Sequence, residues 1–479
     1  KETNVINSLA GKVAGLVVTQ TAGGASGSTR VLLRGNTEIS GNNQPLYVID
    51  GVPLDNTNFG SAGQSGGYDL GDGISAINPD DIETMTVLKG PAASALYGSR
   101  ASHGVILITT KKADSGKFSA EYNGSLTIDT QLAKWDDVQQ IYGQGNGGKY
   151  SHSATSQTNQ SWGPKGDMNK MLYFDNEERP FYIYPNNADG FFRTGLTTQN
   201  TAIISASSGK TGMRFSVTDM RNKDILPKTH MGRDNFNLRV NTSWKKLDFD
   251  FNANYTREDV KNRPALGDSQ SNVGKNLMTL ANSYNQIWLR KYQTADGSYS
   301  AWNGNDQYNR NPYWDLYKNQ NTTAKDVFRF TAKAVYNIDK HFKLQGTLGT
   351  DINNMDFEDY IARTTPGKAA GQLSNNIYRN RTLNAEILGL YNNSWGAWDL
   401  NATLGGNIFK VSNKTTFLLG TSQQMDDLIA IMNYQEQNIQ ENTYKKQINS
   451  IYGSASVGYD HTYYLEATLR GDKSSTLPL

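Results

Sequence analysis

The feature of this 479-residue sequence that most limits its fold is a set of long segments in which apolar and polar residues alternate. In "KLDFDFNANYT" (246–256), Leu247, Phe249 and Phe251 fall on one face, and aspartate and asparagine residues fall on the other. A period of two residues is that of a β-strand with one apolar face. About eleven such segments occur, near 117–129, 200–208, 212–220, 234–244, 246–256, 326–338, 341–353, 380–393, 397–410, 444–460 and 462–471. Each has the ~9–11 residues, or slightly more, that a tilted strand needs to cross a bilayer.

The connections between these segments alternate between short and long. The short ones are 208–212, 244–246, 339–340, 393–396 and 460–461. The long ones are 130–199, 221–233, 257–325, 354–379 and 411–443. A meander with tight turns at one end and long loops at the other is typical of an outer-membrane β-barrel, whereas a soluble sandwich has no reason to sort its loops by end. We therefore predict a mainly β protein built on a large antiparallel transmembrane barrel.

Composition alone leaves a soluble β-rich protein open as an alternative. Only 37% of the residues are apolar, but the hydropathy signal of a barrel is weak by construction. The net charge of +2 gives no electrostatic reason to expect a nucleic-acid partner. The absence of cysteine excludes a disulfide framework and thiolate metal sites.

Motifs for catalysis or cofactor binding are weak. "GQGNGGKY" (143–150) has the glycines and lysine of a phosphate-binding loop, but Tyr150 stands where such a loop needs serine or threonine. The five histidines are scattered without zinc spacing, and "DLGDG" (69–73) lacks the spacing of a calcium loop. We predict that the protein is not an enzyme and has no cofactor or metal.

The first part of the chain has a different sequence pattern, in which glycine-rich turns separate short apolar runs. These runs are Gly15–Thr19, Val31–Leu33, Leu46–Ile49, Met85–Leu88 and Val105–Thr109. They predict four or five strands with one or two short helices in a compact mixed α/β unit. The sequence therefore predicts two domains, a small mixed α/β domain over 1–113 and a partial barrel of about eleven strands over 114–479.

A barrel whose lumen holds a domain of this size is of the plugged transporter type, with about 22 strands when complete. We therefore predict that residues 1–113 are a plug in the lumen and that roughly half of the barrel strands are present. An unpaired last strand would leave backbone groups unsatisfied in lipid, at several kcal/mol each. We expect Leu479 to end a partial chain, with the remaining strands beyond this sequence or in another polypeptide.

Two stretches of the first region resemble the plug of SusC-family TonB-dependent transporters, the nutrient importers of Bacteroidota. They are "VLLRGNTEISGNNQPLYVIDGVPL" (31–54) and "INPDDIETMTVLKGPAASALYGSRASHGVILITTKK" (77–112). The resemblance identifies a structural plug signature, whose members are Arg34, Gly35, Tyr47, Asp50, Gly51, Lys89, Gly90, Tyr97, Gly98 and Gly104. The strand "YYLEATLRGDKSS" (463–475) also resembles a barrel strand of the family, with Lys473 where glycine is common.

The signature has two expected physical roles. The glycines would supply backbone-permissive corners. The charged residues Arg34, Asp50, Glu83, Lys89 and Arg100 would form plug–wall ion pairs in a wet lumen, with solvated turns as the alternative.

The resemblance implies energised import of a nutrient, such as an oligosaccharide or oligopeptide, across the cell outer membrane. An external solute would bind among the long loops and the upper plug face, under a lid formed by a SusD-like surface lipoprotein. TonB would act through an N-terminal segment that this sequence lacks, and the assembly in outer-membrane lipid would be a dimer of transporter–lipoprotein pairs. The alternatives are a passive porin or surface adhesin on the same barrel, and a soluble β-rich carbohydrate-binding module or hydrolase. Nothing in the sequence assigns the substrate-binding residues or chooses glycan over peptide.

Overall fold

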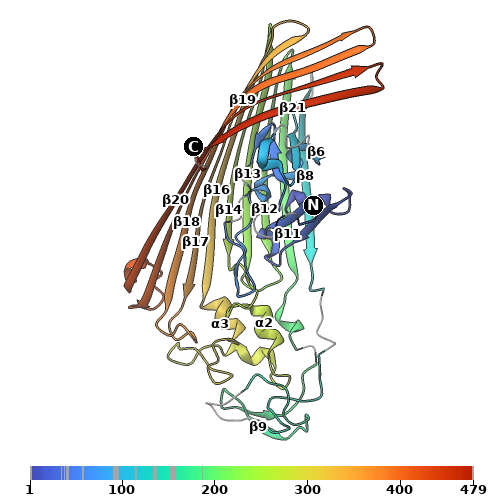
Figure 1. Ribbon diagram of the computed structural model, residues 1–479. Helices are drawn as coiled ribbons and strands as arrows, with labels where there is room; N and C mark the ends of the chain where they lie inside the picture. The colour runs from blue at the N-terminus through green and yellow to red at the C-terminus, as the bar shows by residue number, and fades with distance from the viewer. Residues whose placement is uncertain are drawn as a thin grey trace.

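The alternating segments of the sequence form one large antiparallel sheet, called the wall below, with the predicted plug against it (Figure 1). The computed structural model describes residues 3–33, 35–36, 38, 43–54, 56, 59–89, 97–113, 116–132, 138–150, 158–185 and 187–476. Within these residues the wall has 11 strands that follow one another in chain order, apart from short strands in the loops. The strands are β8 (Phe118–Asp129), β11 (Gly195–Ser208), β12 (Thr211–Lys223), β13 (His230–Trp244), β14 (Leu247–Lys261), β16 (Gln320–Asn337), β17 (Phe342–Ile361), β18 (Gln372–Trp395), β19 (Trp398–Gln423), β20 (Tyr434–Tyr459) and β21 (Tyr463–Ser474). This confirms the predicted fold class and the predicted up-and-down order.

The two faces of the wall differ in polarity, as the alternation predicts. Large apolar side chains stand exposed on the outer face, among them Phe236, Phe328 and Leu404. The inner face carries buried polar side chains such as Arg214 and Arg239. In a soluble sandwich the apolar faces would meet in a dry core, whereas here they face outward. The outward apolar face is the one that a lipid bilayer would cover.

Several strands are longer than the sequence pattern predicts. The segment 411–443 was expected to be a loop, but it is largely strand, because β19 and β20 each contain 26 residues. Much of 354–379 is also strand, at the ends of β17 and β18. The ladder of backbone hydrogen bonds continues there although the apolar alternation stops. Pairing with a neighbouring strand therefore extends these strands beyond the length that a bilayer requires.

The plug is a small mixed unit with its own core. Its elements are η1 (Val5–Leu9), β1 (Leu16–Gln20), η2 (Gly24–Ser26), β2 (Thr29–Leu33), β3 (Leu46–Ile49), β4 (Val52–Pro53), β5 (Gly67–Tyr68), η3 (Ile74–Ala76), η4 (Pro79–Asp81), β6 (Ile82–Leu88), η5 (Gly98–Ala101) and β7 (Val105–Thr110). Strand β7 lies at the centre of a four-stranded sheet, parallel to β3 and antiparallel to β6. Its Ile106 and Ile108 are buried with Tyr47 and Val31 in the plug core. Each of the five apolar runs forms a strand, but the described plug also contains β4, β5 and five short 3-10 helices, more than the four or five strands and one or two helices expected.

The long loops gather at one end of the wall, below the sheet in Figure 1. Their elements are β9 (Lys170–Leu172), β10 (Glu178–Pro180), η6 (Asp189–Phe191), β15 (Ala265–Leu266), α2 (Val273–Met278), η7 (Gln286–Arg290), α3 (Pro312–Tyr317) and η8 (Ile431–Asn433). Asn272 and Asn311 cap α2 and α3. Tyr284, Trp302 and other aromatic side chains pack these loops around a core of their own, which gives the loops a fixed shape. Among the described residues, no helix is long and apolar enough to cross a membrane.

Candidate functional site

The plug is tied to the inner face of the wall by buried arginines, and Arg239 on β13 forms the first of these anchors. Its guanidinium binds both oxygens of Asp250 at 2.9 and 2.7 Å. It also donates to the plug, to the carbonyl of Thr110 at 2.6 Å and to Asp50 at 3.2 Å. Asn252 donates to the other oxygen of Asp50 at 2.9 Å. Because Arg239 and Asp50 are about 95% buried, this network lies out of water and is energetically demanding to break.

A second anchor joins the start of plug strand β6 to β12. Arg214 and the Ser216 hydroxyl both donate to Asp81, each at 2.6 Å. Asn78, which caps η4 by accepting from the backbone N–H of Asp80, donates from its other side to Thr218 at 2.7 Å. The short turn Asn78–Asp81 therefore has one part that shapes the plug and another that binds the wall.

A third anchor contains several charges of both signs. Glu258 on β14 accepts from Arg233 at 2.8 and 2.6 Å and from Arg263 at 3.4 Å. Arg233 then reaches the plug at the carbonyl of Thr3, at 2.9 Å, and Arg263 reaches the carbonyl of Asp69 at 3.0 Å. These arginines therefore connect the wall to the first residues of the plug and to its 69–73 turn.

Lys325 on β16 extends the third anchor, because it donates to the carbonyl of Asp72 at 2.9 Å. Burial raises the pKa of the Asp72 carboxyl, which also accepts the backbone N–H groups of Thr29 and Ser75. The 69–73 turn is thus bound from the plug side and from the wall side.

The plug is also clasped by a long loop. Strand β5 of the plug pairs with β15 of the loop that follows β14, with Tyr68 opposite Ala265 and Gly67 opposite Leu266. Ser269 strengthens this contact by accepting the backbone N–H of Gly67 at 2.8 Å. We call residues 63–68 and 265–269 the clasp. The clasp directly links the long loops to the plug.

Replacing Ser269 by alanine should loosen the clasp. The lost hydrogen bond is worth about 1 kcal/mol, which corresponds to roughly fivefold faster amide hydrogen exchange in residues 63–68. The matched control is Ser298→Ala, because Ser298 bonds Asp296 in an exposed turn without a described plug contact. Equal exchange of residues 63–68 in both variants would show that the clasp does not depend on this bond.

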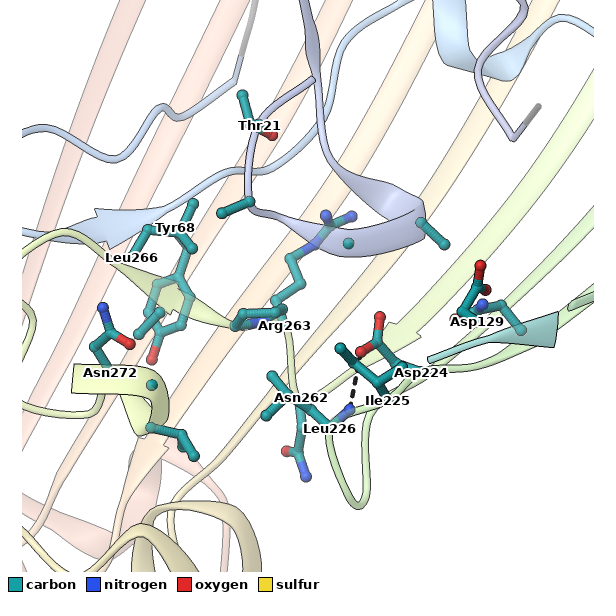
Figure 2. Close-up of a pocket in the computed structure, with 18 of the residues that line it drawn as sticks. Thr21, Tyr68, Asp129, Asp224, Ile225, Leu226, Asn262, Arg263, Leu266 and Asn272 are labelled. Atoms are coloured by element: carbon teal, nitrogen blue, oxygen red, sulfur yellow. Dashed lines mark hydrogen bonds between the residues drawn. The ribbon is translucent and has the colours of Figure 1, made fainter. Parts of the chain in front are cut away.

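A cavity of about 1110 Å³ lies where the plug, the wall and the long loops meet. It is slightly larger than typical small-molecule sites of ~300–1,000 Å³. Figure 2 shows Arg263 in the middle, with Tyr68 of the plug on one side and Asp129 and Asp224 on the other. Amide and hydroxyl side chains form much of the lining, including Thr21, Asn222, Asn262, Asn272, Asn319 and Asn321. This lining suits a polar ligand that makes many hydrogen bonds.

Carboxylates also line the cavity, at Asp129, Asp224, Asp315 and Asp359. Burial raises the pKa of Asp224, and the neighbouring charge of Asp129 raises it further. Burial likewise raises the pKa of Asp315 although Arg310 is close. The Tyr68 hydroxyl donates to Asp359 at 3.1 Å, and burial together with that carboxylate raises the Tyr68 pKa. The cavity is therefore acidic as well as polar.

Comparison with known proteins agrees with this arrangement. Residues 1–105 match the family model described as TonB-dependent Receptor Plug Domain. Over 267 residues the chain is 32% identical to the TonB-dependent receptor SusC of Bacteroides thetaiotaomicron, covering 55% of this chain and 23% of that protein. This chain carries a TonB-dependent receptor plug and is similar to SusC. The wall, with its outward apolar face, therefore lies in the outer membrane as the β-barrel part of a TonB-dependent receptor.

Further relatives cover the whole chain. The TonB-dependent receptor P26 of Formosa agariphila is 25% identical over 492 aligned residues, which cover 99% of this chain and 45% of that protein. The fold is similar to a chain of the RagAB peptide importer in its "closed-closed" state, with a TM-score of 0.74 and 18% identity. That match covers 99% of this chain and 54% of the RagAB chain. The chain thus covers less than half of SusC and of P26, and about half of the RagAB chain.

The described glycines of the plug signature lie at corners of the plug. Gly35, Gly51, Gly98 and Gly104 all have positive φ, at 83°, 89°, 67° and 87°. Asp50 and Gly51 form the two-residue turn between β3 and β4, and both have positive φ, as a type I′ hairpin turn requires. Gly90 lies outside the described residues.

The other residues of the plug signature have varied surroundings. Tyr47 is fully buried in the plug core, and Tyr97 packs against the small cluster around Val48. The Lys89 ammonium donates to the carbonyl of Ala14 within the plug. Arg34 lies outside the described residues. The structural role of the whole signature stays a prediction.

Among the described residues expected to form plug–wall ion pairs, Asp50 does so, with Arg239. Glu83 is exposed and forms no ion pair within the described part of the chain. Arg100 instead lies over the ring of Phe409 on β19, with its guanidinium carbon 4.0 Å from the ring centroid. Contact with the wall therefore combines charge pairing with cation–π packing.

Sequence reasoning missed the wall residues of the three anchors. The register of the strands, once known, gives a signal for them, since Arg214 on β12 lies directly opposite Arg239 on β13. Like charges in directly opposite positions destabilise a sheet unless another group neutralises them. Asp81 and Asp50 of the plug supply that neutralisation. Without a known register, the two arginines were only two of many inward polar residues.

Proposed function

We propose that the complete receptor containing this chain imports a nutrient, such as an oligosaccharide or oligopeptide, across the outer membrane with energy supplied through TonB. The observation that carries this proposal is the set of buried contacts between plug and wall, which includes the ion pairs Arg214–Asp81 and Arg239–Asp50. Removing one partner of such a pair costs about 3–5 kcal/mol, and at least three anchors hold the plug. A solute that passes through this part of the lumen must disturb these contacts, so passage calls for external work.

The partners follow from the same proposal. TonB acts on a segment N-terminal to the plug, and the pull reaches the anchor at Thr3 first. A SusD-like surface lipoprotein covers the long loops. Their exposed apolar side chains Trp162, Met278, Ile287 and Tyr308 would gain most from such a lid. Two transporter–lipoprotein pairs form the complete assembly.

The cavity is the proposed binding place for the imported molecule. It lies between the plug and the loops, and the clasp passes beside it through Tyr68 and Leu266. RagAB is a peptide importer, which supports an oligopeptide as the nutrient, and SusC is a TonB-dependent receptor, which supports the dependence on TonB. A molecule bound in the cavity would act on the plug through the clasp.

Energised import predicts that uptake depends on the proton gradient. In cells that carry the full-length receptor, collapse of the gradient or deletion of TonB should reduce uptake of isotope-labelled glycan and peptide digests by more than about tenfold, because the anchors resist thermal opening. Surface binding of the same digests in the cold should be unchanged. Uptake that persists without TonB would contradict this proposal and favour a passive pore.

A further inference from the structure

One side of the cavity presents two carboxylates that form no ion pair with a basic side chain of the described chain. Asp129 ends β8, Asp224 follows β12, and the two repel each other electrostatically. Figure 2 shows both at the same side of the cavity. The charge of Arg193 offsets part of the Asp224 charge, but its hydrogen bonds go to the carbonyls of Asp224 and Thr229 rather than to the carboxylate. Two like charges that share a site favour a cation between them.

The opposite side of the cavity holds a second acidic pair. Asp359 accepts from Tyr68, and Asp315 lies within electrostatic range of both. The Asp315 side chain is 1% exposed, and one of its oxygens accepts from Arg310 at 3.0 Å and from Asn319 at 2.7 Å. Its other oxygen, Oδ2, has no hydrogen-bond donor within the described residues. A buried acceptor without a donor is costly, and a ligand that brings an N–H group would relieve that cost.

The two basic residues in the lining do not offset these charges. Arg263 directs its N–H groups to the protein, at Thr323, Ser26, the Asp69 carbonyl and Glu258. Lys12 is exposed to solvent, where screening weakens its effect on the interior. The cavity thus has four carboxylates, and the described chain provides one close arginine partner for them, Arg310 at Asp315.

We propose that this cavity binds positively charged amino groups of the imported molecule. A primary ammonium group fits between Asp129 and Asp224 and donates to both, and a second one reaches Oδ2 of Asp315. The ammonium group can come from a basic peptide or from an amino sugar, which share this chemistry. A neutral glycan would leave the carboxylates unpaired, and an acidic molecule would be repelled. The proposal rests on the proposed import function for its biological meaning but not for the binding itself.

The test measures binding to the purified full-length receptor in detergent, which needs no energy source. The probes are a short lysine-containing peptide, a short glucosamine oligomer and the N-acetylated form of each, because acetylation removes only the charge. At least one amine probe should bind about tenfold or more tightly than its acetylated form. The double variant Asp129→Asn/Asp224→Asn should lose most of that preference. Raising the salt concentration should weaken the amine probe selectively.

The matched control is Asp460→Asn, in a short turn at the opposite end of the wall, where a φ of 51° is well tolerated by asparagine. It should keep the full preference for amines. A preference confined to the peptide or to the sugar identifies the source of the ammonium group and supports the proposal. Equal binding of amine and acetylated probes by the unmodified receptor would overturn it, as would an unchanged preference in the double variant. Either result leaves the TonB dependence of uptake untouched, so the two proposals fail independently.

Discussion

Replacing Arg239 by alanine is expected to weaken the attachment of the plug to the wall by about 3–5 kcal/mol. The substitution leaves Asp50 of the plug and Asp250 of the wall without their shared cation, and Asp50 is buried. Amide hydrogen exchange of residues 46–54 and 105–112 in the full-length receptor should accelerate by about one hundredfold to several thousandfold, since every 1.4 kcal/mol is tenfold.

The neighbouring strand offers a matched control for this prediction. Arg221 on β12 also has two aspartate partners, Asp219 at 2.6 Å and Asp234 at 2.8 Å, but its side chain is 51% exposed. Arg221→Ala should therefore cost no more than about 1 kcal/mol and leave exchange in the plug unchanged. If the two variants behave alike, the Arg239 network does not hold the plug.

Replacing Gly104 by alanine is expected to destabilise the plug itself by about 2–5 kcal/mol. Gly104 precedes β7 with a φ of 87°, which costs an L-residue about 1–2 kcal/mol. The added Cβ would also lie 2.6 Å from Leu33 Cδ1 and 3.0 Å from the Leu88 carbonyl oxygen, and overpacking adds about 1–3 kcal/mol. Faster exchange across β6 and β7, with the wall strands unchanged, would report this loss.

Gly51→Ala separates the two contributions to the Gly104 effect. Gly51 has a nearly identical φ of 89°, but no heavy atom of the described chain lies within 4 Å of the position that its Cβ would take. Gly51→Ala should therefore cost about 1–2 kcal/mol, from backbone conformation alone. Similar losses of stability in both variants would mean that the contacts with Leu33 and Leu88 do not contribute to the Gly104 effect.

Much of the architecture could be read from the sequence because it depends on local patterns. A side chain's face in a strand follows from a period of two, so "KLDFDFNANYT" already defines the apolar and polar faces of β14. Asp50-Gly51 is the preferred sequence of a type I′ hairpin turn, and it forms that turn. The lengths of β19 and β20 were underestimated, because their outer parts carry no apolar alternation and are specified by pairing with each other.

The functional contacts, in contrast, depend on residues that lie far apart in the chain. Arg239 meets Asp50 across 189 positions, and the carboxylates of the cavity come from β8, β17, the turn after β12 and helix α3. The alternation of a strand predicts that an arginine points inward, but it does not predict which aspartate the arginine will bind. The partner of each arginine is determined by the register of the wall strands and by the position of the plug against them. Buried charges are stable only when their partners are in place, so packing in three dimensions selected both the anchors and the acidic cavity.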